Sequence, residues 1–225
     1  MTFHIITIFP EIFDAYFNES IIRRAKEKGK IKIKIYDLRG WTTDRHRTVD
    51  DKPYGGGAGM VLRPEPIFKA VADIKKKIGK KKKARVVLFS AKGKKYTQTR
   101  VKKLAGFQHV IMICGRYEGI DERVAKYLAD EEISAGDFVL TGGEIPAMML
   151  VDSVTRLLPG VLGNKESLAF ESHTEVGYLE YPHYTRPEIL TVKNKKIKVP
   201  KVLLSGNHGK IEEWKKKNSR FLINK

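Results

Sequence analysis

The sequence predicts an α/β domain built on a mainly parallel sheet, followed by a smaller and more polar C-terminal part. Short β-rich runs alternate with helical patterns over residues 1–160. Two runs, residues 85–89 and 109–113, are continuously apolar, which is typical of strands buried on both faces of a parallel sheet. After Pro159-Gly160 the periodicity ends and Gly, Ser, His, Pro and Tyr become frequent. The alternation predicts the fold class, and the change of composition predicts the domain boundary.

The first elements of the large domain follow from apolar runs and breakers. Residues 3–9 are expected to form a strand, and Pro10-Glu11 opens a helix that continues in broken form through residues 20–28. Gly29 ends this helical part. Residues 31–36 alternate between isoleucine and polar side chains, as expected of a half-buried strand.

The remaining elements repeat this alternation. Pro64-Glu-Pro66 begins a helix that runs to Ile78, because proline is tolerated in the first turn of a helix. We expect further helices at 97–105, 119–129 and 144–157. The strand 85–89 lies between the helices 64–78 and 97–105, and the strand 109–113 lies between the helices 97–105 and 119–129. Beyond these, we expect a loop or linker at 160–188, one or two short strands at 193–204 and a very basic helix at 210–221.

Composition limits the class of protein. The chain has 225 residues and 41% hydrophobic residues, enough for one core or a core with a small satellite domain. Its 44 Lys and Arg against 26 Asp and Glu give a net charge of +18, which favours a polyanionic partner, usually nucleic acid, over solubility alone. Apolar stretches are far shorter than the ~20 residues of a membrane helix, and the N-terminus lacks a secretory signal. With the single Cys114, this predicts a cytoplasmic protein without a membrane partner. The six histidines lack ligand spacing, so no metal site is predicted.

The first segment with a functional composition covers residues 44–59. Four glycines within five positions leave backbone amides uncovered and permit positive φ, so that a ligand can approach closely. No Gly-Lys-Ser/Thr follows, which excludes a Walker loop. The flanking Arg45-His46-Arg47 and Asp50-Asp51 favour a binding loop over a flexible linker.

Three further segments are rich in glycine, arginine and carboxylate side chains, at positions where a hydrophobic core does not need them. Residues 115–123 follow a buried strand directly, and ligands of open α/β sheets bind at the carboxyl ends of strands. Residues 134–146 combine a loop, a short apolar stretch and a Gly-Gly turn into a helix, which could surround a small ligand. The last segment comprises Arg156 with residues 171–174 and 182–187.

Together these segments resemble the bacterial tRNA (guanine-N1)-methyltransferases of the TrmD type, which belong to the SPOUT superfamily of knotted methyltransferases. The matching strings are residues 44–60, 115–123, 136–146, 152–163, 182–187 and 203–208. Several long strings in a fixed order make this resemblance much more specific than a single glycine motif.

The resemblance implies a fold, a reaction and an assembly. The expected fold is a parallel α/β domain with a deep C-terminal trefoil knot, an exception to the rule that chains do not thread loops. It implies a knotted catalytic domain at 1–162, a linker at 163–175 and a small, mostly helical tRNA-binding domain at 176–225. The implied enzyme is a homodimer with a shared active site that methylates N1 of guanosine 37 in tRNA with S-adenosylmethionine. The family is also associated with a Mg²⁺ requirement.

The resemblance also implies the residues that contact the ligands. Those expected to bind the cofactor are Leu88, Phe89, Ser90, Gly115, Arg116, Tyr117, Glu118, Ser134, Ala135, Gly136, Asp137, Phe138, Val139, Leu140, Gly142, Gly143 and Pro146. Those expected to contact tRNA are Arg45, His46, Arg47, Asp50, Tyr54, Gly55, Gly56, Gly57, Ala58, Gly59, His183 and Lys215. Ala58 stands where the family often has proline, which should loosen the loop without removing a functional group.

The chemistry requires a base and a cation. Guanine N1 carries a proton that must be removed, and the negative charge then spreads onto O6. The family uses an aspartate and an arginine, and the arginine matches Arg156. Glu171 occupies the aspartate position, in a stretch about one residue longer than expected, and its extra methylene moves the carboxylate by roughly 1.5 Å. Glu171 is therefore the predicted base, with Glu175 as the alternative; otherwise Glu171 is a solvated linker residue.

Two other functions remain open at this point. One is a knotted RNA methyltransferase that modifies a ribose 2′-hydroxyl, which the carboxylate base and residues 182–187 disfavour. The other is a non-catalytic RNA-binding protein that keeps the fold, for which the departure at Glu171 is the only support.

Overall fold

The computed structural model describes residues 1–79, 81–163, 171–193 and 195–222. The chain divides into two compact units, Met1–Gly163 and Asn164–Lys225, each of which is described by itself. No helix in the described ranges is both long and apolar enough to cross a membrane.

A five-stranded parallel sheet forms the centre of the large unit. Its order is β2-β1-β6-β5-β7, and every neighbouring pair is parallel, which confirms the predicted fold class. The strands are β1 (Thr2–Thr7), β2 (Lys32–Asp37), β5 (Ala84–Lys95), β6 (His109–Ile113) and β7 (Glu131–Ser134). The two apolar runs predicted as interior strands occupy β5 and β6, which are neighbours inside the sheet with both faces covered.

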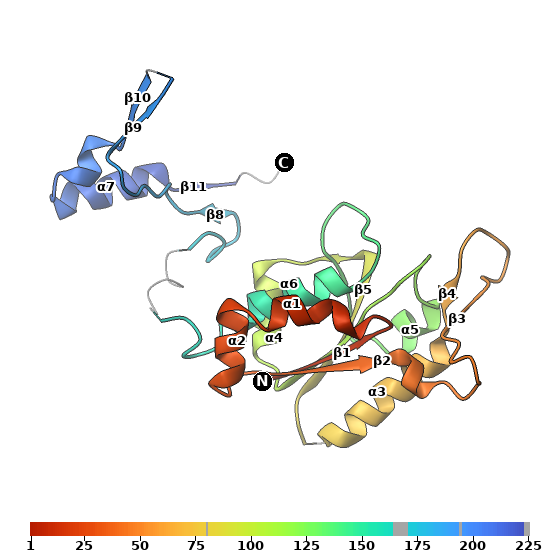
Figure 1. Ribbon diagram of the computed structural model, residues 1–225. Coiled ribbons are helices and arrows are strands. Elements are labelled where there is room, and N and C mark those ends of the chain that lie inside the picture. Colours follow the sequence, from red (N-terminus) through yellow and green to blue (C-terminus); the bar gives the residue numbers. More distant parts are fainter. Residues whose placement is uncertain (80, 164–170, 194, 223–225) are drawn as a thin grey trace. The chain divides into compact units, whose positions relative to one another are not determined.

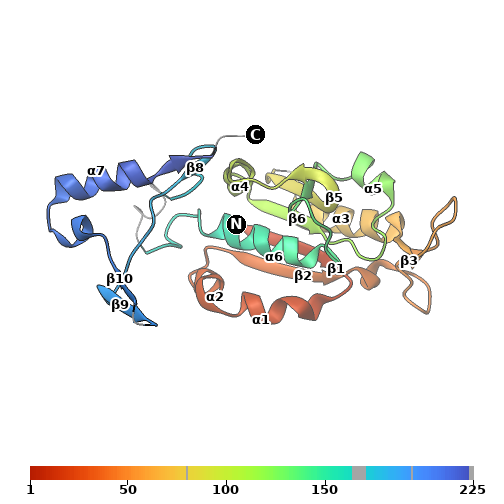
Figure 2. The same cartoon turned by 90° about the horizontal axis from the view of Figure 1, so that it is seen from above.

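Helices cover both faces of this sheet (Figures 1 and 2). One face packs against α1 (Asp14–Phe17), α2 (Ser20–Glu27), α4 (Gln98–Ala105) and α6 (Glu144–Thr155), together with the short 3-10 helix η1 (Pro10–Phe13). The other face packs against α3 (Pro64–Ile78) and α5 (Glu122–Tyr127), with η2 (Leu38–Trp41) beside α3. Two separate apolar clusters, one on each face, therefore form the core of the large unit.

Helix α5 and strand β7, which lie next to the site, differ from the prediction. The helix expected at 119–129 begins later, because Asp121 is its N-cap and accepts a hydrogen bond from the Arg123 amide at 2.9 Å. Strand β7 was not predicted at all. Its sequence, Glu-Glu-Ile-Ser, has a single large apolar residue, and only its pairing with β5 makes it a strand.

Strand β5 breaks its register against β7. Val87, Leu88 and Phe89 pair with the first residues of β7, and Lys94 and Lys95 pair again with its last residues. The segment between them leaves the regular ladder. A Cβ on Gly93 would lie only 2.6 Å from the Ile133 amide nitrogen, so the return of β5 to β7 requires glycine there.

The small unit contains a basic helix and two pairs of short strands. They are β8 (Tyr178–Leu179), β9 (Ile189–Val192), β10 (Lys195–Lys198), the 3-10 helix η4 (Lys201–Leu204), α7 (His208–Asn218) and β11 (Arg220–Phe221). Strand β9 pairs with β10, and β8 pairs with β11. The unit is thus less helical than expected.

The observed bounds of the elements in the small unit differ from the predicted ones. Helix α7 starts at the Asn207 cap, whose side chain accepts a hydrogen bond from the Lys210 amide at 3.1 Å. It ends before Ser219, because residues 220–221 pair with β8 instead of continuing the helix. Residues 189–192, which directly follow the expected loop 160–188 and were assigned to no element, form a strand because β10 supplies a partner. Of the expected linker 163–175, residues 164–170 lie outside the described ranges.

Candidate active site

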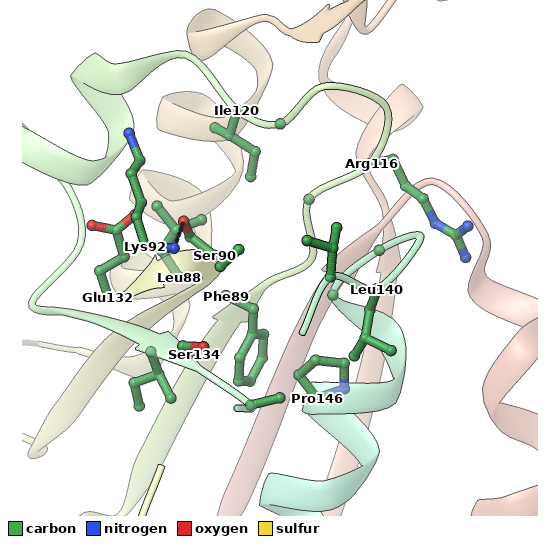
Figure 3. Close-up of a pocket in the computed structure, with 18 of the residues that line it drawn as sticks. Leu88, Phe89, Ser90, Lys92, Arg116, Ile120, Glu132, Ser134, Leu140 and Pro146 are labelled. Atoms are coloured by element: carbon green, nitrogen blue, oxygen red, sulfur yellow. Dashed lines mark hydrogen bonds between the residues drawn. The ribbon is translucent and has the colours of Figure 1, made fainter. Parts of the chain in front are cut away.

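A cavity of about 430 Å³ opens where β5, β6 and β7 leave the regular sheet (Figure 3). Three chain segments line it: the end of the regular part of β5, the loop after β6 with the first turn of α5, and the stretch from β7 to the start of α6. This is the position at which open parallel sheets bind ligands, because the loops there leave backbone groups unpaired.

Nearly all residues predicted to bind a cofactor line this cavity. Those that do are Leu88, Phe89, Ser90, Gly115, Arg116, Tyr117, Glu118, Ser134, Ala135, Phe138, Val139, Leu140, Gly142, Gly143 and Pro146. Gly136 and Asp137 do not. The fold therefore brings together three segments that are far apart in the sequence, while the binding role of their residues stays a prediction.

Several lining residues were not predicted from the sequence. They are Ala91, Lys92, Gly119, Ile120, Glu122, Ala125, Glu132, Ile133 and Thr141. Glu132 and Ile133 belong to β7, so missing that strand meant missing them. Lys92 stands in a basic stretch that gives no sign of facing a cavity.

Arg116 is held by a buried carboxylate. Its Nε donates to Oε2 of Glu144 at 3.0 Å, and the Thr7 hydroxyl donates to Oε1 of the same carboxylate at 2.7 Å. Glu144 is 1% exposed, and the guanidinium also lies 4.7 Å from the centre of the Phe9 ring. In Figure 3 the Arg116 side chain points away from the cavity. Its charge therefore stabilises the loop after β6, and its predicted contact with the ligand stays a prediction.

The loop after β6 and the turn before α6 are packed backbone against backbone. The Gly143 amide donates to the Gly115 carbonyl at 3.0 Å, and Arg116 forms an isolated antiparallel bridge with Gly142. A Cβ on Gly143 would lie 2.7 Å from the Cα of Cys114, which no side-chain movement could relieve. The glycine pair thus permits the close approach of two walls of the cavity.

Cys114 is not a candidate nucleophile. It is buried, and burial raises the pKa of its thiol well above the ordinary value. A neutral thiol without access to solvent is chemically inert.

The glycine loop is joined to the cavity. It connects β3 (Asp50–Asp51) to β4 (Val61–Leu62), and its Gly55, Gly56, Gly57 and Gly59 all have positive φ. The Glu118 amide donates to the Met60 carbonyl at 3.0 Å, and the Leu62 amide donates to the Gly119 carbonyl at 3.0 Å. Because these bonds tie the loop to the segment that lines the cavity, residues predicted to contact tRNA lie next to residues predicted to bind the cofactor.

The exposed part of this loop carries the predicted tRNA contacts. The side chains of Arg45, His46, Arg47 and Tyr54 are exposed, as are the glycines and Ala58. Asp44 closes the preceding turn, accepting hydrogen bonds from the Thr48 amide and, at 2.7 Å, from its hydroxyl. These bonds lower the pKa of the Asp44 carboxyl, so it stays ionised beside the arginines. Asp50 is half-buried in β3.

The two predicted catalytic residues belong to different units. Arg156 is the half-buried C-cap of α6 in the large unit, where its amide donates to the Asp152 carbonyl at 3.1 Å. Glu171 is half-buried in the small unit, and its carbonyl accepts from the Thr174 amide at 3.2 Å. Their pairing in one site stays a prediction.

His183 and Lys215 come together around one aromatic ring of the small unit. The His183 ring lies 4.8 Å from that of Tyr181, and the Lys215 ammonium lies 5.3 Å from the centre of the Tyr181 ring. Lys215 also pairs with Glu212 at 2.6 Å, which raises the pKa of Lys215. This is a basic and aromatic surface of the kind that binds nucleic acid.

Comparisons with known proteins agree with this architecture. The chain is a parallel α/β protein with a ligand cavity at its strand ends, and the family model "tRNA (Guanine-1)-methyltransferase TrmD" matches residues 1–223. The chain belongs to this family. It is 50% identical over 219 residues to the tRNA (guanine-N(1)-)-methyltransferase of Anoxybacillus flavithermus, covering 97% of this chain and 86% of the relative. It is 53% identical over 215 residues to the enzyme of the same name from Dictyoglomus turgidum, covering 96% of this chain and 83% of the relative.

A solved structure shares the fold. The crystal structure of tRNA (m1G37) methyltransferase from Aquifex aeolicus matches with a TM-score of 0.77 and 42% sequence identity. The match covers 96% of this chain and 87% of that chain.

Proposed function

We propose that the protein transfers a methyl group from S-adenosylmethionine to N1 of guanosine 37 of tRNA, next to the anticodon. One observation carries this proposal. The family match spans almost the whole chain, and two of the segments that make the chain resemble the family, residues 115–123 and 136–146, line one cavity.

The cavity fits the proposed methyl donor in size and lining. Its volume of about 430 Å³ suits a nucleoside with a short side chain. Phe89, Leu140 and Pro146 offer apolar surface for a purine ring. When bound, S-adenosylmethionine supplies a methyl group already activated on a sulfonium sulfur.

The protein must supply a base, a cation and alignment. We assign Glu171 as the base that removes the N1 proton of guanine, with Glu175 as the alternative. Arg156 would stabilise the negative charge that develops on O6 as that proton leaves. Alignment of guanine N1 with the methyl group accounts for the rest of the catalysis.

The glycine loop is the proposed binding site for the guanine. A base removed from the anticodon loop loses stacking worth a few kcal/mol and must regain it in the protein. Tyr54 and Tyr117 are exposed aromatic rings on the glycine loop and on the loop after β6. Arg45, Arg47 and Lys215 would contact phosphates, which adds affinity without reading the sequence.

A homodimer with a shared active site is part of this proposal. Phe9, Ile12, Tyr16 and Ile145 are large apolar side chains exposed on the large unit, and such a patch suits a partner subunit. A second copy would explain how a carboxylate of the small unit serves a cavity of the large unit. The trefoil knot and a location in the cytoplasm are likewise proposed from the family.

Magnesium enters none of these steps. Among the described residues no group of three or more His, Cys, Asp or Glu side chains could hold a metal ion. The Mg²⁺ requirement therefore stays a family expectation without an assigned site.

The test is mass spectrometry of tRNA incubated with the protein and methyl-labelled S-adenosylmethionine. Labelled 1-methylguanosine is expected with a tRNA that has G37, and none with its G37→A variant. A labelled ribose methyl would indicate a different methyltransferase, and an unlabelled tRNA would indicate a binding protein.

A further inference from the structure

Two stretches of the large unit carry positive charge that the proposed reaction does not use. Residues 28–36 hold four lysines, and residues 75–85 hold seven lysines and Arg85. Neither stretch contains an aspartate or a glutamate. Like charges repel one another, so this concentration of one sign favours a partner that carries negative charge.

The register of the parallel sheet brings both stretches to one edge. Thr2 pairs with Lys32 on one side and with His109 on the other, and His109 pairs in turn with Ala84. One row of residues therefore crosses four strands from Lys32 to Ala84. Neighbouring strands lie about 4.8 Å apart, so the row is about 15 Å long. This is the amino end of the sheet, where β1 and β2 begin beside the N-terminus (Figure 1).

Exposed lysines stand at both ends of this row. Lys34 lies on β2 and Lys82 precedes β5, yet both act on one ring: burial lowers the pKa of His109, and the charges of Lys82, the N-terminus and Lys34 lower it further. Arg85 differs from these lysines, because Glu131 binds its guanidinium at 2.9 Å. No carboxylate in the described part of the chain forms an ion pair with the lysines of what we call the amino-edge patch, which are Lys32, Lys34, Lys81, Lys82 and Lys83.

The amino-edge patch and the cavity lie at opposite ends of the sheet. Strand β1 has six residues, so its two ends are about 16 Å apart. The cavity opens at the carboxyl ends of β5 and β6, whereas the patch lies where the strands begin. An RNA segment bound at the patch is therefore a different segment from the one whose guanine enters the cavity.

The chemistry of the patch suits the backbone of a nucleic-acid helix. Double-stranded DNA carries one phosphate per about 1.7 Å of its axis, and an RNA helix is similarly dense, so several phosphates face a row of about 15 Å. The described residues of the two stretches include no exposed large apolar or aromatic side chain. Stacking of unpaired bases and insertion into a lipid surface both need such side chains. We propose that the amino-edge patch binds the phosphate backbone of a second RNA helix, separate from the tRNA arm that is methylated.

Binding of a short fluorescent RNA duplex to the full-length protein tests the proposal. The variant combines Lys32→Gln, Lys34→Gln and Lys82→Gln. Each lysine–phosphate contact that is lost reduces the slope of log K against log[salt] by about 0.9, which corresponds to about eightfold weaker binding at 0.1 M salt. The combined variant should reduce the slope by about 1–3 and weaken duplex binding about tenfold or more. Because the three side chains are exposed and repel one another, the fold should be retained.

A control variant removes the same charge elsewhere on the large unit. It combines Lys69→Gln, Lys94→Gln and Lys126→Gln, all at exposed positions outside the patch. This control should weaken duplex binding less than about threefold. Both variants should methylate an isolated anticodon stem-loop at the wild-type rate, and a saturating amount of the stem-loop should not displace the duplex.

Four outcomes would overturn the inference. They are unchanged duplex binding by the patch variant, equal weakening by the control variant, displacement of the duplex by the stem-loop, and a patch variant that loses binding to phosphatidylserine vesicles while it keeps duplex binding. Equal weakening would show that only net charge matters, displacement would show a single RNA site, and the vesicle result would assign the patch to a membrane surface. A wild-type protein that binds the duplex and forms no 1-methylguanosine would overturn the proposed function and leave this inference standing.

Discussion

Replacing Glu144 by alanine tests how the loop after β6 is held. The substitution removes the acceptor of two hydrogen bonds, one from the neutral Thr7 hydroxyl and one from the charged Arg116 guanidinium. Because the acceptor in both is a carboxylate, each bond contributes about 1.5–3 kcal/mol. Since Arg116 is 19% exposed, it can regain some contact with water after its partner is lost. The expected loss in the free energy of unfolding is therefore about 3 kcal/mol, below the upper range for breaking a buried ion pair.

Thermal unfolding measures this loss. For a chain of this length, about 3 kcal/mol lowers the Tm by about 6–12 °C. The control is Glu27→Ala, which breaks an exposed pair with Arg23 at 3.4 Å and should cost less than about 0.5 kcal/mol.

A double-mutant cycle identifies the cause. If Glu144→Ala destabilises the fold because the Arg116 charge is left without its partner, the two substitutions are not additive. The double variant with Arg116→Ala must then lose less free energy of unfolding than the sum of the two single variants. A Tm within about 2 °C of the wild type, or losses that simply add, would refute this account of the buried pair.

Three other predictions use different measurements. Burial, and then the neighbouring His109, lower the pKa of His4 to about 4. The stability that the neutral ring gives the fold is therefore fully present above about pH 6.5 and is lost as the pH falls from there through 4. His4→Gln should give a flatter plot of Tm against pH than the wild type, and parallel plots would contradict this. Glu171→Gln should abolish methyl transfer to tRNA while S-adenosylmethionine binding by calorimetry is unchanged; near-normal turnover would transfer the base role to Glu175. Lys215→Ala should weaken tRNA binding and reduce the slope of log K against log[salt] by about 0.7–0.9, whereas Arg156→Ala should mainly lower turnover; a salt slope equal to that of the wild type would remove Lys215 from the tRNA interface.

The predicted strands agree with the structure where both faces of the strand are buried. Residues 85–89 and 109–113 are continuously apolar because helices cover both faces of β5 and β6, and this burial is visible in composition alone. Strand β7 lies at the edge of the sheet with two glutamates in its sequence, so its extended conformation depends on pairing with β5. The cavity residue Glu132 could not be predicted for the same reason.

The role of Arg116 shows a second limit. The motif predicted Arg116 as a cofactor-binding residue, and it gave no sign that the guanidinium pairs with Glu144. In sequence, Glu144 is an ordinary acidic residue in the first turn of a helix. Its burial depends on β1, which brings Thr7 beneath the turn, and on the order of strands in the sheet.

The sequence by itself determined the parallel α/β class, the excess of positive charge and the glycine-rich segments, because these depend on composition and on periods of a few residues. It also located most of the cavity lining, through strings specific enough to identify a family. Only the tertiary structure decided which side chains face the cavity and which are committed elsewhere. The physical reason is that Arg116 with Glu144, and Glu132 with Lys92, meet through the strand order β2-β1-β6-β5-β7, and this order is a property of long-range packing.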